Sequence, residues 1–195
     1  MYYTVKKNCK STATVILAGG LSSRMGSNKA FLSINGIHFV DHVISILKKV
    51  GLETIFISGC LPDYDCILDQ NKNLGPMEGV RSSINYLKNS NYSNLLFIQV
   101  DIPLINEVLM NKFLLNYFEN NINYYTNFPL PFIVKMENAL SVLCINNNLY
   151  SIYSFLNALK CSSIDPSFQD SYILKGVNNP LELELLNKYL KENLK

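Results

Sequence analysis

Short apolar runs alternate with amphipathic segments along the first part of the chain. The runs are rich in β-branched residues and end at turn residues, which predicts buried strands at 13–18, 54–58, 66–68 and 94–100. Apolar residues recur at helical spacing in the segments that follow them, which predicts helices at 38–50, 79–87 and 109–117. Alternating strands and helices of this kind predict an α/β layer fold with a mostly parallel sheet.

The remainder of the chain has a weaker pattern. It predicts two more strands, at 140–145 and 172–177, and two more helices, at 149–159 and 180–190. Residues 120–135 mix aromatic residues and prolines without a clean period, which predicts an irregular insertion near the ligand site. No internal repeat or linker is visible in the sequence. We therefore expect a polar extension at 1–12 and one domain at 13–195.

Composition narrows the functional classes. The chain has 195 residues, 48% of them hydrophobic, and a net charge of +2, which indicates a globular protein without a nucleic-acid-binding field. Its five cysteines include no C-x-x-C pair, so reduced thiols in the cytoplasm are expected rather than disulfides or zinc. The apolar run at 13–18 is too short for a membrane span or a signal peptide. We expect a cytoplasmic protein that binds neither nucleic acid nor membranes.

Candidate chemistry begins in segment 17–29, LAGGLSSRMGSNK, directly after the first predicted strand. A polyphosphate needs close backbone amides, and glycines permit these because they accept positive φ and carry no side chain. It also needs cations, which Arg24 and Lys29 supply, and Ser22 can donate a hydroxyl. The spacing matches neither a Walker A motif nor G-x-G-x-x-G. Two glycines alone would indicate a tight turn, but the added cations favour a phosphate site.

Polar residues follow two of the predicted strands. Asp101 comes directly after the run 94–100, and Pro103 prevents the strand from continuing. Ligands of parallel sheets bind beyond the carboxyl ends of the strands, and Mg²⁺ takes one or two carboxylates plus phosphate oxygens. Asp101 is therefore a candidate metal ligand, with a helix N-cap as the alternative. Asn178 could complete the metal shell, and Asp69 is a weaker candidate for the ligand site, because both residue types are also common in turns.

Taken together, these segments resemble the molybdenum cofactor guanylyltransferases, the MobA-like nucleotidyltransferases. The first block, L-A-G-G-x-S-S-R-M-G-x-x-K, is the most specific, and it is followed by Phe31-Leu32 and Asn35-Gly36. Later blocks similar to the family's motifs are Asp69 with Gly75-Pro76-Met77-Glu78-Gly79, Asp101-Ile102-Pro103, and Gly176-Val177-Asn178-Asn179-Pro180. They follow the family's order over roughly residues 13–190. The resemblance implies a Rossmann-like three-layer αβα fold of the nucleotide-diphospho-sugar transferase type.

The resemblance also implies the site residues. The implied nucleotide-binding set is Leu17, Ala18, Gly19, Gly20, Ser22, Lys29, Ser58, Asp69, Gly75 and Asp101. The implied catalytic residues are Arg24, Lys29 and Asp101, and the implied Mg²⁺ ligands are Asp101 and Asn178. The pair Gly19-Gly20 is similar to the guanylyl form, whereas related cytidylyltransferases usually read L-A-A-G.

The implied reaction is transfer of GMP from GTP to molybdopterin, which releases pyrophosphate and forms the guanine dinucleotide cofactor. A phosphate oxygen of the acceptor would attack the α-phosphorus in line, and no protein nucleophile is needed. Transient contact with cofactor-biosynthesis proteins or a molybdoenzyme apoprotein is a further implied partnership. The alternatives are CTP with molybdopterin, a nucleotide with a sugar phosphate, or a non-catalytic nucleotide-binding accessory protein.

The chain departs from the family pattern at three places. Ser58 stands where the guanylyltransferases usually carry Asn, and Gly176 replaces the first Asn of N-x-N. Asn138-Ala139 stands where many members carry His-Pro, in a region expected to face the acceptor. The first departure bears on recognition of the base, the second removes one polar contact near the metal, and the third leaves the identity of the acceptor open.

Overall fold

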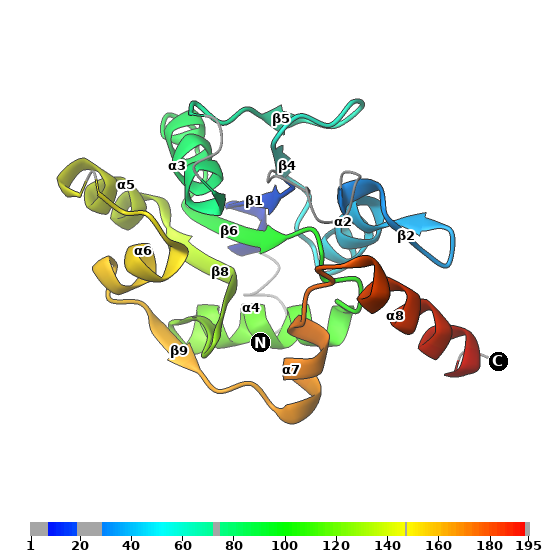
Figure 1. Cartoon of the computed structure of the whole chain (residues 1–195). Coiled ribbons are helices and arrows are strands. Elements are labelled where there is room, and N and C mark those ends of the chain that lie inside the picture. Colours follow the sequence, from blue (N-terminus) through cyan, green and yellow to red (C-terminus); the bar gives the residue numbers. More distant parts are fainter. Residues whose placement is uncertain (1–7, 19–28, 72–74, 147, 194–195) are drawn as a thin grey trace.

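A mixed β-sheet lies at the centre of the fold (Figure 1). The computed structural model of the chain describes residues 8–18, 29–71, 75–146 and 148–193. Within these residues the sheet has seven strands in the order β5-β4-β1-β6-β8-β7-β9. Their bounds are β1 Thr12–Leu17, β4 Ile55–Ser58, β5 Cys66–Ile67, β6 Asn94–Gln99, β7 Ile122–Tyr125, β8 Phe128–Lys135 and β9 Ser162–Ile164. A separate ribbon pairs β2 Ser33–Ile34 with β3 Ile37–His38.

The sheet is mostly parallel. β1 pairs in parallel with both β4 and β6, and β4 pairs in parallel with β5. β8 pairs antiparallel with both β6 and β7, and β7 and β9 are again parallel. Parallel neighbours require a crossover connection, usually a helix, between them, which is why strands and helices alternate along the chain. The predicted α/β class is confirmed.

Helices cover both faces of the sheet, which gives the three layers visible in Figure 1. Their bounds are α2 Phe39–Lys49, α3 Pro76–Leu87, α4 Glu107–Asn120, α5 Met136–Ile145, α6 Ile152–Ala158, α7 Phe168–Leu174 and α8 Pro180–Asn193, with a short 3₁₀ helix η1 at Lys29–Phe31. α2 and α4 pack in one core with Ile16 and Ile98, whereas α3, α5 and α6 pack in the other with Val15 and Phe97. Within the described residues, no helix combines the length and the apolar character needed to cross a membrane.

The segment 120–135 forms two strands of the sheet, so the prediction of an irregular insertion is wrong. β7 and β8 pair through Tyr124 and Phe132, and the register shifts at Tyr125. The register shift and the prolines of β8 break the strict alternation that reveals a strand in the sequence. In addition, Phe132, Ile133 and Val134 are all buried, because β8 lies inside the sheet with helices on both faces.

Two predicted strands are helical instead. Residues 140–145 belong to α5, which begins at Met136 and buries Ala139 and Leu143. A short apolar run does not distinguish a strand from a buried helical segment, and only the longer spacing that includes Met136 reveals the helix. Residues 172–174 belong to α7, whose first turn is capped by Ser167 accepting a hydrogen bond from the Asp170 amide at 3.1 Å.

An ion pair between Lys112 and Asp170 connects α4 with α7. Lys112 Nζ lies 2.5 Å from Asp170 Oδ2, and the side chains are 47% and 12% exposed, respectively. Burial raises the pKa of Asp170, but the hydrogen bonds from Lys112 and Ser167 and the Lys112 charge together lower it below its ordinary value. The folded protein therefore favours the ionised Asp170.

We expect Asp170→Asn to lower the free energy of unfolding at pH 7 by about 1 kcal/mol, because water screens the half-exposed Lys112. An unfolded Asp titrates near pH 4 and the folded pKa is lower, so this stabilisation is complete above about pH 5 and is lost as the pH falls through the folded pKa. Urea unfolding at a series of pH values from 7 downwards measures the difference in the free energy of unfolding between wild type and variant. If this difference does not become smaller below about pH 4, the ion pair does not stabilise the protein as proposed.

Candidate active site

The carboxyl ends of β1, β4, β5 and β6 meet at one edge of the sheet (Figure 1). Leu17, the last residue of β1, pairs with Ser58 on one side and Gln99 on the other. The Ala18 amide continues this contact by donating to the Ser58 carbonyl at 3.1 Å. Asp101 follows β6 at the same edge. The structure thus brings together four residues that the sequence assigns to one site: Leu17, Ala18, Ser58 and Asp101.

Lys29, Asp101 and Asn178 form the polar centre of this edge. Lys29 Nζ lies 2.6 Å from Asp101 Oδ2 and donates to Asn178 Oδ1 at 3.1 Å. The Lys29 and Asp101 side chains are 21% and 18% exposed, so the pair is shielded but still open to a ligand. Residues far apart in the sequence therefore place two oxygen acceptors around a single cation.

The backbone of segment 176–178 is fixed beside Asp101. The Val177 amide donates to the Asp101 carbonyl at 2.8 Å, and the Asn178 amide donates to Glu182 Oε2 at 2.7 Å in the first turn of α8. A Cβ atom at Gly176 would lie 3.3 Å from both the carbonyl oxygen and Oδ1 of Asp101. Glycine therefore lets this segment approach closely, and an Asn in its place would require the Asp101 carboxylate to shift by a few tenths of an ångström.

Ser58 and Asp69 form a second polar contact at the same edge. Ser58 is 2% exposed, and its hydroxyl donates to Asp69 Oδ1 at 3.3 Å. Partial burial raises the pKa of Asp69 above its ordinary value, the hydrogen bond from Ser58 opposes that shift, and the charge of Glu78 adds to it. The carboxylate is thus held on one side by a buried hydroxyl.

Gly79 leaves the space that the Ser58 hydroxyl occupies. A Cβ atom there would lie 2.3 Å from Ser58 Oγ, 3.4 Å from Ser58 Cβ and 3.3 Å from Leu17 Cδ2. Such overpacking costs about 1–3 kcal/mol, and the better helix propensity of Ala offsets only about 1 kcal/mol of that. We expect Gly79→Ala to lower the free energy of unfolding measured in urea.

The Ser58→Ala background supplies the control for this prediction. Without the hydroxyl, the shortest contact is gone, so Gly79→Ala should cost at least about 1 kcal/mol less than in the wild type. An equal cost in both backgrounds would show that the Ser58 contact is not the cause.

The structure does not test the other five residues that the sequence assigns to the nucleotide site. Gly19, Gly20, Ser22 and Arg24 lie outside the described residues. Gly75 directly precedes α3, and its φ of +79° is a conformation that L side chains rarely adopt. The role of each of these five residues stays a prediction.

Asn138 and Ala139, which are expected to face the acceptor, lie at the opposite edge of the sheet from Lys29, Asp101 and Asn178. They belong to the first turn of α5, which follows Lys135. Lys135 pairs with Asn94 at the beginning of β6, whereas Asp101 lies beyond its end. The cause is the antiparallel direction of β8, which carries the chain away from the site.

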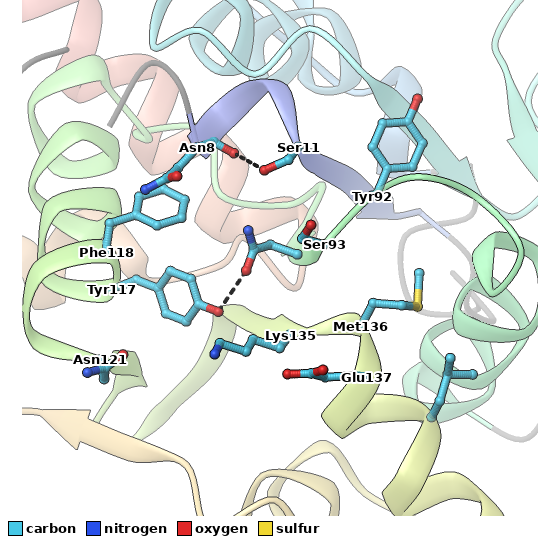
Figure 2. A pocket seen from close by; sticks show the side chains of 12 residues that line it. Asn8, Ser11, Tyr92, Ser93, Tyr117, Phe118, Asn121, Lys135, Met136 and Glu137 are labelled. Atoms are coloured by element: carbon cyan, nitrogen blue, oxygen red, sulfur yellow. Dashed lines mark hydrogen bonds between the residues drawn. The ribbon is translucent and has the colours of Figure 1, made fainter. Parts of the chain in front are cut away.

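A pocket of about 650 Å³ also lies at that opposite edge (Figure 2). Asn94, Tyr117 and Lys135 are among the residues that line it, and the Tyr117 hydroxyl donates to Asn94 Oδ1 at 3.0 Å. None of its lining residues belongs to the predicted site. The candidate site is identified by the two oxygen atoms that converge on Lys29, and not by the volume of this pocket.

The described side chains do not form a complete metal site by themselves. In the part of the chain that the structure describes, no cluster of three or more His, Cys, Asp or Glu side chains could hold a metal ion. Mg²⁺ needs no such cluster, because it usually keeps several waters and binds one or two carboxylates together with substrate phosphates. The carboxylate of Asp101 and the amide oxygen of Asn178 are oxygen ligands of the kind that Mg²⁺ takes together with substrate phosphates.

One buried carboxylate was not distinguished by the sequence. Glu78 lies in the first turn of α3, and its side chain is 3% exposed. Acidic residues are common in the first turn of a helix, because they interact favourably with the helix dipole. Only the burial of Glu78, which the sequence does not reveal, separates it from an ordinary surface residue.

Comparison with known proteins gives consistent results. A family model described as the MobA-like NTP transferase domain matches residues 14–127. A molybdenum cofactor guanylyltransferase of Xanthomonas euvesicatoria is 28% identical over 184 residues, which cover 92% of this chain and 94% of that protein. A probable molybdenum cofactor guanylyltransferase of Clostridium perfringens is 35% identical over 105 residues, about half of either chain at 51%.

A solved structure shares the fold. Molybdopterin-guanine dinucleotide biosynthesis protein A from Archaeoglobus fulgidus superposes with a TM-score of 0.66, covering 92% of this chain and 99% of that one. The two sequences are 14% identical, so this likeness establishes the architecture alone.

Proposed function

The chain belongs to the family of MobA-like NTP transferase domains, and on this basis we propose that it transfers GMP from GTP to molybdopterin. The transfer releases pyrophosphate and forms the guanine dinucleotide cofactor. The observation that carries the proposal is the arrangement of Lys29 against Asp101 Oδ2 and Asn178 Oδ1 at the strand edge. The five free cysteines are in keeping with a reducing compartment such as the cytoplasm.

The oxygen donors at this edge fit a Mg²⁺ ion. Asp101 Oδ2 and Asn178 Oδ1 already converge on one positive charge, the Lys29 ammonium, at 2.6 and 3.1 Å. A hard divalent cation prefers such carboxylate and amide oxygens. Asp101 and Asn178 would hold the ion, which when bound would neutralise charge on the phosphate oxygens.

The side chains of the protein have separate tasks in the proposed reaction. Lys29 is a compact cation with partial exposure, suited to bind the phosphate oxygens and to stabilise the charge that develops on the leaving pyrophosphate. Arg24 would add a second cation of fork geometry. The acceptor phosphate oxygen forms a bond to the α-phosphorus while the bond to the bridging oxygen of pyrophosphate breaks. Positioning and charge stabilisation account for this step without a protein nucleophile.

The nucleoside is proposed to lie beside Asp69. Its carboxylate is held by the Ser58 hydroxyl and has acceptor capacity left for ribose hydroxyls or for the amino and imino donors of guanine. The Gly19-Gly20 pair, in place of L-A-A-G, favours GTP over CTP. Transfer of a cytidylyl group to molybdopterin, or of a nucleotide to a sugar phosphate, is the alternative within the same enzyme class.

Pyrophosphate release by the purified protein tests the function. With Mg²⁺, we expect release that requires both GTP and freshly isolated molybdopterin, and much less release with CTP or ATP. Release with CTP but not GTP would assign the alternative donor. GTP binding without pyrophosphate release under any acceptor would contradict enzymatic function and support an accessory nucleotide-binding role.

A further inference from the structure

Glu78 is a charged side chain inside the protein, close to the candidate site. It is 3% exposed, and it is in the first turn of α3. A buried carboxylate is strongly disfavoured unless hydrogen bonds and opposite charges compensate the loss of water. Its Oε1 atom accepts three hydrogen bonds, and Arg81 Nε lies 3.8 Å from Oε2. The compensation is therefore built from specific partners: two of the hydrogen bonds come from Asn71, in the loop before α3, and the other two contacts come from Ser82 and Arg81 of α3 itself.

These partners fasten the loop that carries Asp69. Glu78 Oε1 accepts from both the backbone amide and the side-chain amide of Asn71, each at 3.0 Å. The Ser82 hydroxyl donates to the same Oε1 at 3.3 Å and accepts from the Gln70 backbone amide at 2.9 Å. Both backbone amides that directly follow Asp69 are thus attached to α3.

Asp69 is consequently held from two directions. On one side its carboxylate accepts from Ser58, which belongs to the sheet. On the other side Glu78 and Ser82 fix the backbone of the next two residues to α3. These bonds fix the backbone at Gln70 and Asn71, directly after Asp69, and so set the direction of the Asp69 side chain.

We propose that Glu78 is a positioning residue, which orients Asp69 toward the nucleoside part of the nucleotide. This inference rests on the proposed function, since it assumes that Asp69 contacts the bound nucleotide. Glu78 itself is too buried to reach a ligand. Its effect should therefore appear in the binding of the nucleotide, and kcat at saturating nucleotide should change by less than about 3-fold.

The direct test is the dissociation constant of GTP, measured by calorimetry without an acceptor. Glu78→Ala removes the acceptor for Asn71 and is expected to weaken GTP binding about 10- to 100-fold, as for loss of charge-assisted hydrogen bonds. Glu78→Gln keeps a side-chain oxygen at the place of Oε1 and should stay within about 3-fold of the wild type. Glu137→Ala, an exposed first-turn carboxylate of α5, is the matched control and should have no effect.

The Asp69→Asn background separates positioning from a general structural role. If Glu78 acts through Asp69, Glu78→Ala should weaken GTP binding by less than about 3-fold once Asp69 is replaced. An equal loss in both backgrounds, or wild-type affinity of Glu78→Ala, would overturn the inference.

A further variant keeps the inference testable if Glu78→Ala does not fold. Ser82→Ala removes only the acceptor for the Gln70 amide and the donor to Glu78, and it should weaken GTP binding about 3- to 10-fold. Wild-type affinity of that variant would then overturn the inference. The binding measurement contains no acceptor and does not depend on turnover. Absence of pyrophosphate release by the wild type in the separate assay with GTP and molybdopterin would therefore contradict the proposed function and leave this binding result standing.

Discussion

Asp101→Asn is expected to lower kcat for GTP-dependent pyrophosphate release by about 10²–10³-fold while the protein stays folded. The substitution keeps the size of the side chain but removes the negative charge that now faces Lys29 at 2.6 Å. Without that charge, the proposed Mg²⁺ ligand becomes a weak neutral donor, and the ion is no longer held against the phosphate oxygens.

Two controls make the result interpretable. Asp165→Asn changes an exposed Asp that follows β9, which lies three strands from β6 in the sheet, and should leave kcat unchanged. Urea unfolding should show that Asp101→Asn loses little stability, because both partners of the pair are partly exposed and Asn still accepts a hydrogen bond from Lys29. Turnover of Asp101→Asn within about 3-fold of the wild type would remove Asp101 from the mechanism.

Lys29→Met is expected to cause a loss in kcat of similar size, about 10²–10³-fold, because it removes a cation that offsets the charge of the leaving pyrophosphate. In the absence of nucleotide, the same substitution should strengthen the binding of a divalent metal ion. The Lys29 ammonium occupies both Asp101 Oδ2 and Asn178 Oδ1, so its removal frees these oxygens for a divalent ion. We expect the affinity of the nucleotide-free protein for Mn²⁺ to rise about tenfold.

Electron paramagnetic resonance titration of free Mn²⁺ measures this second effect independently of turnover. Lys112→Met is the matched control, since Lys112 pairs with Asp170 between α4 and α7 and should leave the affinity for Mn²⁺ unchanged. Unchanged affinity in Lys29→Met would mean that Lys29 does not compete with the metal for Asp101.

The strands and helices of the first half of the fold can be predicted from the sequence, because their apolar residues recur with different periods. β1 and β6 are unbroken β-branched or apolar runs, and α2 and α3 show helical spacing with turn residues at their ends. Those of the second half cannot, because local pattern and tertiary position disagree there. Residues 140–145 are apolar enough for a strand. However, the preceding strand β8 already has a neighbouring strand on each side, and the segment packs as α5 against α3.

Residues of the candidate site can be predicted where their position next to a strand or in a glycine-rich segment distinguishes them. Asp101 is recognisable because it follows a buried strand directly, and Lys29 because it is the cation that ends the glycine-rich segment 17–29. Their direct contact, with Asn178 added, was not predictable, since it joins segments that are adjacent only in the fold. Glu78 was missed for a related reason, because its burial depends on the Asn71 loop folding back onto α3.

A crystal structure with Mn²⁺ and a non-hydrolysable GTP analogue tests the central claim most directly. We expect an anomalous peak for the ion at a coordination distance of about 2.1 Å from Asp101, with Lys29 turned from the carboxylate to the phosphate oxygens. A nucleotide bound at the opposite edge of the sheet, in the pocket beside Asn94 and Lys135, would contradict the account. So would an ion held elsewhere while Lys29 still bridges Asp101 and Asn178.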